Sequence, residues 1–133
     1  TPSNYVALTT GIKNDTTKQQ FISAFSHAIS TPWYQYFLKM DAADYLNKIT
    51  CNVLALNGDK DKQVIATTNL AGSAKGLKNN HQPHNKMVTM PGLNHLFQHC
   101  NKCTLNEYGL LEETFSPEVL SLMSSWIKEV SSR

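Results

Sequence analysis

Residues 51–64 read CNVLALNGDKDKQV, and residues 86–98 read KMVTMPGLNHLFQ. Each segment contains a short apolar run that ends near a glycine, Gly58 in the first and Gly92 in the second. Continuous apolar runs of this length are typical of strands that are buried on both faces in a parallel sheet. Between the runs, residues 64–78 carry apolar side chains at helical spacing. A strand, a helix and a strand in this order predict a right-handed crossover and two neighbouring parallel strands.

Further helices are predicted on both sides of this unit. Residues 16–29 have apolar side chains on one helical face, and Pro32 fits the first turn of a second helix. Asp41 is expected to cap a short third helix that continues to residue 46. After the second strand, residues 116–118 (SPE) provide the cap, the proline and the acidic residue that begin a helix. The predicted fold class is α/β, with two parallel strands in a βαβ unit flanked by helices.

The composition narrows the classes of protein to consider. With 133 residues, the chain is long enough for one domain and too short for two ordinary ones. A net charge of +2 with scattered lysines gives no reason to expect nucleic acid or an anionic membrane as a partner. No apolar stretch reaches the roughly 20 residues of a membrane span. The first residues, TPSNYVALTTG, do not read as a signal peptide.

Acidic residues and histidines follow the two predicted strands. Asp59 and Asp61 lie in the loop after the first strand, and His95 and His99 lie in the loop after the second. Ligand sites of open parallel sheets lie beyond the carboxyl ends of the strands, and neighbouring strands are about 5 Å apart. An aspartate and a histidine from these loops can therefore form a hydrogen bond that fixes the imidazole tautomer for proton transfer.

These segments resemble the C-terminal part of an α/β-hydrolase. They are most similar to bacterial esterases and acyl hydrolases of the dienelactone-hydrolase and prolyl-oligopeptidase-like group. The matching motifs are G-x-x-D at residues 58–61 and G-x-x-H at residues 92–95, each directly after a strand. The likeness extends from about Trp33 to the end of the chain, and it includes EYGLLEETFSPEVLSLMSSWIKE at residues 107–129.

The resemblance implies roles for individual residues. In the family, the acid of the catalytic triad precedes the histidine along the chain. Asp61, rather than Asp59, would be this acid and His95 the base. The substrate would be a small ester or acyl compound, and no metal ion or organic cofactor would be needed. The compartment stays open, with the bacterial cytoplasm and the periplasm as the candidates. The family's nucleophile is the serine of a G-x-S-x-G motif, and the nearest imitation here, AGSAKG, places Ser73 inside the predicted helix.

The expected organisation is the C-terminal part of an α/β-hydrolase domain over residues 1–133. Residues 1–46 form a helical, lid-like segment, in which residues 17–40 would contribute helices over an acyl pocket. Residues 47–133 form the strand–helix–strand–helix part that carries the Asp and His loops. Without the serine, this chain alone is predicted to be inactive, and the serine is expected in an N-terminal part of the parent hydrolase. The expected partner is that N-terminal part, or a second copy that covers the exposed strand edge.

The histidines and cysteines after the second strand allow a different interpretation. His95, His99, Cys100 and Cys103 are four nitrogen and sulfur ligands, the number that tetrahedral zinc requires. They crowd into one short loop, whereas zinc signatures usually separate two ligand pairs by about a dozen residues or more. Cys100 and Cys103 can instead form a local disulfide, or they can lie in a loop at the rim of the site without a chemical role. The competing hypothesis for function is a non-catalytic binding module, with or without zinc. The remaining cysteine, Cys51, is expected to be a buried thiol in the first strand.

Overall fold

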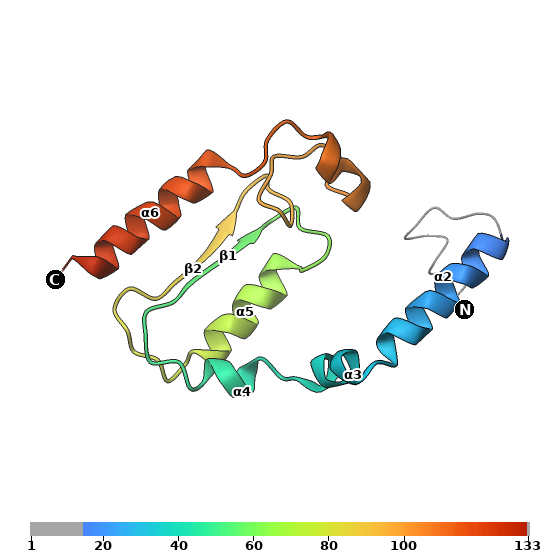
Figure 1. The fold of residues 1–133 in the computed structure, drawn as a ribbon. Coiled ribbons are helices and arrows are strands. Elements are labelled where there is room, and N and C mark those ends of the chain that lie inside the picture. The colour runs from blue at the N-terminus through green and yellow to red at the C-terminus, as the bar shows by residue number, and fades with distance from the viewer. Residues whose placement is uncertain (1–14, 133) are drawn as a thin grey trace. The chain divides into compact units, whose positions relative to one another are not determined.

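The computed structural model describes residues 15–132 of the chain (Figure 1). These residues belong to two compact units, Thr1–Asp41 and Ala42–Arg133. The segment TPSNYVALTTG and the other early residues of the predicted lid-like segment, up to residue 14, lie outside the described part. No helix between residues 15 and 132 is long and apolar enough to span a lipid bilayer.

Two helices make up the described part of the first unit. Helix α2 spans Asp15–Ile29 and helix α3 spans Pro32–Lys39, as the apolar spacing and the proline predicted. Thr31 caps α3, since its hydroxyl accepts a hydrogen bond from the backbone N–H of Tyr34 at 3.4 Å. No residue of these two described helices is buried, and Trp33 is 69% exposed. A lid role for this segment stays a prediction.

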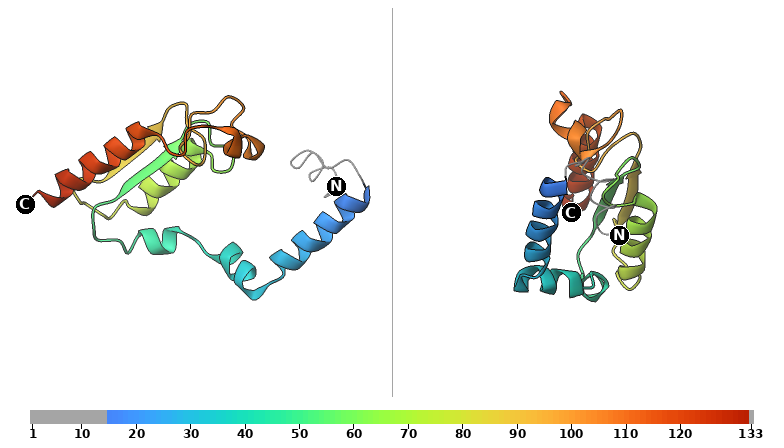
Figure 2. Two further views of the ribbon diagram at one scale, coloured as in Figure 1. Left: turned by 45° about the horizontal axis from the view of Figure 1, so that its top comes forward. Right: turned by 90° about the vertical axis from the view of Figure 1, so that its right-hand side faces the viewer.

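The second unit contains a two-stranded parallel sheet. In chain order its elements are α4 (Ala43–Leu46), β1 (Leu54–Gly58), α5 (Ala66–Gly76), β2 (Lys86–Met90), the 3₁₀ helix η1 (Leu105–Leu110) and α6 (Pro117–Ser131). The two strands pair from Leu54 opposite Lys86 to Gly58 opposite Met90. Figures 1 and 2 show α5 and α6 on opposite sides of this sheet. The predicted strand–helix–strand order and the parallel pairing are therefore confirmed, and residues 15–132 hold no third strand.

The core of the second unit lies between the sheet and α6. It consists of Met90, Leu93 and Val119, with Leu56, Val88, Phe97, Phe115 and Leu122 packed against it. Successive residues of a strand face opposite sides of the sheet. Leu56 therefore contributes to this core, whereas the next residue, Asn57, faces α5 and accepts a hydrogen bond from the side chain of Asn69 at 2.7 Å.

Three predictions from the sequence were wrong. Residues 54–56 are half-buried rather than buried on both faces, because no strand among the described residues covers the other edge of β1. The strand begins at Leu54, so Cys51 lies before it, and the Cys51 thiol is exposed rather than buried. Helix α4 has Ala42 at its N-cap, so Asp41 lies one residue too early to cap it.

Candidate active site

The loops that follow β1 and β2 are hydrogen-bonded to each other. The backbone N–H of Asp59 donates to the carbonyl oxygen of Met90 at 3.0 Å. In return, the backbone N–H of Gly92 donates to Oδ1 of Asp59 at 2.7 Å. Asp59, the alternative candidate for the acid, therefore stabilises the second loop through these hydrogen bonds and is not hydrogen-bonded to a histidine.

The glycines of both motifs allow this close approach. A side chain at Gly58 would overlap the backbone carbonyl oxygens of Leu93 and Asn94. The backbone N–H of Lys60 donates to the Leu93 carbonyl at 3.0 Å, which keeps the two loops in direct contact. Gly92 has a φ of +78°, in the left-handed region that glycine adopts without steric cost. Both loops are therefore fixed relative to the strand ends by backbone geometry.

Asp61 and His95, the predicted acid and base, are brought together. Nδ1 of His95 lies 2.8 Å from Oδ2 of Asp61. The other carboxylate oxygen, Oδ1, accepts hydrogen bonds from the backbone N–H groups of Gln63 at 2.8 Å and Val64 at 2.9 Å. The side chain of Asp61 is 4% exposed and that of His95 is 37% exposed. The carboxylate is thus shielded from water while the imidazole remains accessible.

Asn57 joins this pair, although the sequence interpretation did not assign it a role. Its Nδ2 donates to Oδ2 of Asp61 at 3.2 Å, and its Oδ1 accepts from Nδ2 of Asn69 at 2.7 Å. Asn57 is buried, and a buried amide requires hydrogen-bond partners. A polar residue at the end of an otherwise apolar strand was the signal in the sequence that could have identified it.

The surroundings of Asp61 favour its ionised form. Burial raises the pKa of this carboxyl group, because it penalises the charged form. Hydrogen bonds from the backbone N–H of Val64, from His95 and from the backbone N–H of Gln63 outweigh that effect. The pKa of Asp61 therefore lies below its ordinary value, and the carboxylate is ionised at neutral pH.

The loop that carries His95 is held in place by buried amide side chains. Asn94 and Gln98 are both buried. Oδ1 of Asn94 accepts hydrogen bonds from the backbone N–H of Leu96 at 2.9 Å and of Gln98 at 3.0 Å. Phe97 has a φ of +56°, which is uncommon for a bulky residue. The loop therefore has a defined, tightly bonded conformation at the position of the histidine.

A small cavity of about 140 Å³ opens beside the pair. Its lining consists of Leu56, Asn57, Asp61, Val64, Asn69, His95 and Phe97. Among the described residues, none is hydrogen-bonded to Nε2 of His95.

The geometry determines what His95 can do chemically. An ionised carboxylate only accepts hydrogen bonds, so the Nδ1 atom that faces Asp61 carries the hydrogen. Nε2 of neutral His95 then has a free lone pair. Such an imidazole can take a proton from a hydroxyl group, and Asp61 stabilises the imidazolium that results.

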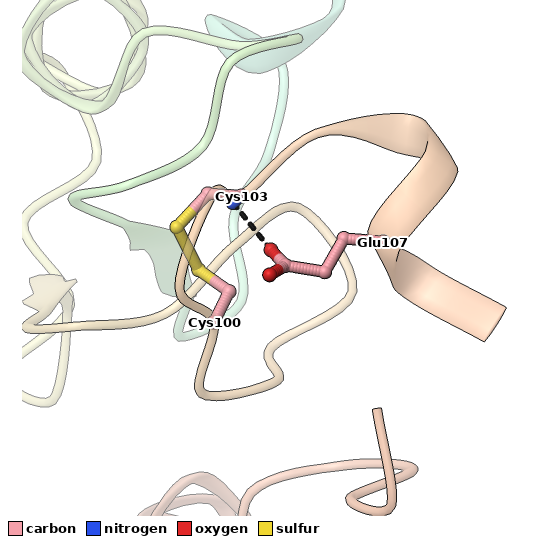
Figure 3. Close-up of side chains that lie close together, drawn as sticks. All are labelled: Cys100, Cys103 and Glu107. Atoms are coloured by element: carbon pink, nitrogen blue, oxygen red, sulfur yellow. Dashed lines mark hydrogen bonds between the residues drawn. A yellow bond between two sulfur atoms is a disulfide. The ribbon is translucent and has the colours of Figure 1, made fainter. Parts of the chain in front are cut away.

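The cysteines beyond this loop form a disulfide between Cys100 and Cys103. Figure 3 shows the carboxylate of Glu107 beside it, accepting a hydrogen bond from the backbone N–H of Cys103. Within residues 15–132, these three form the one group of at least three metal-ligating side chains close enough to share an ion. Because the two sulfur atoms are bonded to each other, neither is a thiolate that can ligate zinc.

The four residues of the alternative zinc hypothesis have different partners. His95 is bonded to Asp61. Nδ1 of His99 lies 2.9 Å from Glu113, and its Nε2 lies 3.2 Å from Glu118 at the start of α6. The two histidines and the disulfide do not converge on one point, so this arrangement offers no tetrahedral set of ligands.

The disulfide loop contacts the loop that carries Asp61. Nζ of Lys62 donates to the backbone carbonyl of Lys102 at 2.6 Å. Nε2 of Gln63 donates to the hydroxyl of Tyr108 in η1 at 3.1 Å. The disulfide therefore belongs to the rim of the candidate site, on the side of the acid.

Ser73 lies within α5, as predicted, and not on a turn between a strand and a helix. The described residues that line the candidate site thus include the predicted acid and base but no serine. No family model, curated protein or solved structure matches the chain. The proposal that follows is based on the motifs and on the geometry of the described residues.

Proposed function

We propose that this chain supplies the acid and the base of a serine hydrolase that cleaves carboxylic esters or related acyl compounds. It would be the C-terminal segment of an α/β-hydrolase fold. The observation that supports this proposal most directly is the 2.8 Å hydrogen bond between Asp61 and His95 at the carboxyl ends of adjacent parallel strands. In α/β-hydrolases the acid and the histidine come in this order along the chain.

In the proposed reaction, Nε2 of His95 removes the proton from a serine hydroxyl as its oxygen attacks the acyl carbon. Asp61 holds the imidazole in the required tautomer and stabilises the imidazolium. His95 then donates the proton to the departing alcohol oxygen, and the same steps with water release the acid. No metal ion or organic cofactor takes part. The serine and the donors that stabilise the oxyanion come from a nucleophile-bearing segment outside these residues.

A groove beside β1 supports association with such a segment. It has a volume of about 320 Å³ and is lined mainly by apolar side chains, which come from β1 and the two residues before it and from Met123, Trp126 and Ile127 of α6. A strand paired with the open edge of β1 would cover this groove and extend the sheet. The proposed partner is therefore the nucleophile-bearing segment, with a second copy of the chain as the alternative.

The test is labelling with a fluorophosphonate, which reacts with serines that a base has activated, followed by intact-mass measurement. The chain alone is expected to form no adduct. In a joined polypeptide, the nucleophile-bearing segment is followed by this chain. This polypeptide is expected to form one adduct per molecule. Its His95→Ala variant is expected to form no adduct. If the chain alone forms an adduct and its His95→Ala variant does not, this would contradict the proposal that the nucleophile lies outside these residues. A folded joined polypeptide that stays unlabelled would contradict the hydrolase proposal.

A further inference from the structure

We infer that Asn57 is a positioning residue for the Asp61–His95 pair, and that Asn69 holds Asn57 in the orientation this role requires. The inference rests on the proposed function only for its catalytic consequence. The positioning itself can be measured in this chain alone. Neither asparagine is hydrogen-bonded to His95, and their hydrogen bonds lead to the pair through Asp61.

The surroundings of Asn57 fix which end of its amide faces Asp61. Nδ2 has three oxygen neighbours: the carbonyl of Gly58 at 3.2 Å, the carbonyl of Val64 at 3.1 Å and Oδ2 of Asp61 at 3.2 Å. Only the NH₂ end of an amide donates hydrogen bonds, and its two hydrogens are shared among these three oxygens. The opposite end, Oδ1, meets Nδ2 of Asn69 at 2.7 Å. Reversing the amide would set oxygen against oxygen at one end and nitrogen against nitrogen at the other.

With Asn57 in place, each oxygen of the Asp61 carboxylate has two hydrogen-bond donors. Oδ1 receives two backbone N–H groups, and Oδ2 receives His95 and Asn57. An ionised carboxylate has about four lone-pair sites, so its capacity as an acceptor is filled. The side chain of Asp61 is 4% exposed, and solvent has little access to replace a donor that is removed. Loss of the Asn57 amide therefore leaves a buried, under-bonded oxygen that is free to shift away from the histidine.

This shift matters because the hydrogen bond at Nδ1 determines the tautomer of His95. When Nδ1–H donates to a fixed carboxylate, the lone pair of the neutral ring is on Nε2. When that bond lengthens or breaks, the ring also populates the Nε2–H tautomer, which cannot accept a proton at Nε2. In the proposed reaction, the loss of Asn57 would thus lower kcat with little change in KM.

The experiment is a pH titration of the ring nitrogens of His95 by long-range ¹H–¹⁵N NMR on the full chain. At pH values at which the His95 ring is neutral, the unmodified chain is expected to show a single tautomer, with the hydrogen on Nδ1. Asn57→Leu removes the donor to Asp61 at similar volume, and it is expected to give a mixture of the two tautomers. Asn69→Asp puts an acceptor against Oδ1 of Asn57, and the same change is expected with a smaller amplitude. Asn69 is exposed, so this second variant decides the question if Asn57→Leu does not fold.

Asn85→Leu is the matched control. The Asn85 side chain also supports β1, since its Oδ1 accepts from the backbone N–H of Val53 at 2.8 Å, but it does so at the opposite end of the sheet. This variant is expected to lower stability and to leave the tautomer of His95 unchanged. The inference is overturned if folded Asn57→Leu or Asn69→Asp retains the single tautomer, or if Asn85→Leu produces the same mixture. These outcomes do not depend on fluorophosphonate labelling, so the inference and the proposed function can fail separately.

Discussion

Oδ2 of Asp61 lies 2.8 Å from Nδ1 of His95, although the two residues are 34 positions apart in the sequence. The crossover through α5 returns the chain to the edge where β1 begins, so β2 runs parallel to β1 and both strands end at the same edge of the sheet. The contact is then fixed by two loops that hydrogen-bond to each other through Asp59 and Gly92. Each of these features leads to a measurable consequence.

The first prediction concerns the acid. In the joined polypeptide, Asp61→Asn is expected to lower kcat by about four orders of magnitude, because the amide favours the wrong tautomer of the histidine. Asp59→Asn is the control, since Asp59 accepts a hydrogen bond from Gly92 and does not contact His95. Steady-state hydrolysis of a chromogenic ester measures both variants. Similar losses in the two variants would show that Asp61 has no special role.

The second prediction concerns the pH dependence of stability. The pKa of Asp61 in the folded chain is below its ordinary value, because hydrogen bonds to the carboxylate outweigh the effect of burial. The unfolded chain therefore binds the proton more tightly, and the stabilisation is complete above the unfolded pKa of about 3.9. It is lost as the pH falls from there through the lower folded pKa.

Urea denaturation between pH 7 and pH 2 measures this contribution. The difference in the free energy of unfolding between the unmodified chain and Asp61→Asn is expected to be largest near neutral pH and to shrink in acid. A difference that stays constant over this range would mean that ionised Asp61 does not stabilise the fold.

The third prediction compares two glycines. Gly58→Ala is expected to destabilise the second unit by about 1–3 kcal/mol, the usual cost of overpacking, since the new methyl group would overlap backbone oxygens of the second loop. Gly72→Ala, in the interior of α5 with open space around it, is expected to stabilise by about 0.5–1 kcal/mol. Thermal unfolding followed by circular dichroism compares the two variants. Equal effects would contradict the close contact at Gly58.

The fourth prediction concerns zinc. The oxidised chain, with Cys100 and Cys103 in a disulfide, is expected to bind no stoichiometric zinc, because two of the four hypothesised ligands are thiolates and a disulfide offers none. Metal analysis after incubation with zinc and gel filtration measures this. His99→Ala is expected to behave like the unmodified chain. One zinc ion per oxidised chain, lost in His99→Ala, would favour the zinc-stabilised binding module instead.

Much of the second unit was predictable because it depends on local patterns. Apolar runs identified both strands, and helical spacing identified α5 and α6. Two further rules, that parallel strands end at one edge and that sites lie beyond this edge, predicted that an aspartate and a histidine of the two loops could meet. The choice of Asp61 and His95 came from the resemblance to α/β-hydrolases. These predictions needed no knowledge of side-chain packing.

The errors arose where the outcome depends on residues distant in the sequence. No role was predicted for Asn57, because its hydrogen-bond partners Asp61 and Asn69 lie outside the apolar run that identified the strand. The burial of Cys51 and of β1 was overestimated because burial depends on neighbouring elements, which an apolar run does not reveal. The pairing of Cys100 with Cys103 was left open, since sequence spacing alone does not distinguish a disulfide from a metal site.

The division into two units has a practical consequence for spectroscopy. The chain has two tryptophans, and each unit contains one: Trp33 in α3 of the first and Trp126 in α6 of the second. Trp33 is exposed, whereas the indole N–H of Trp126 donates to the backbone carbonyl of His84 at 2.7 Å. In a Trp33→Phe variant, selectively excited tryptophan fluorescence would report on α6 and its contact with the chain leading into β2. The unit that carries Asp61 and His95 thus contains its own fluorophore, and its unfolding can be followed without attaching a dye.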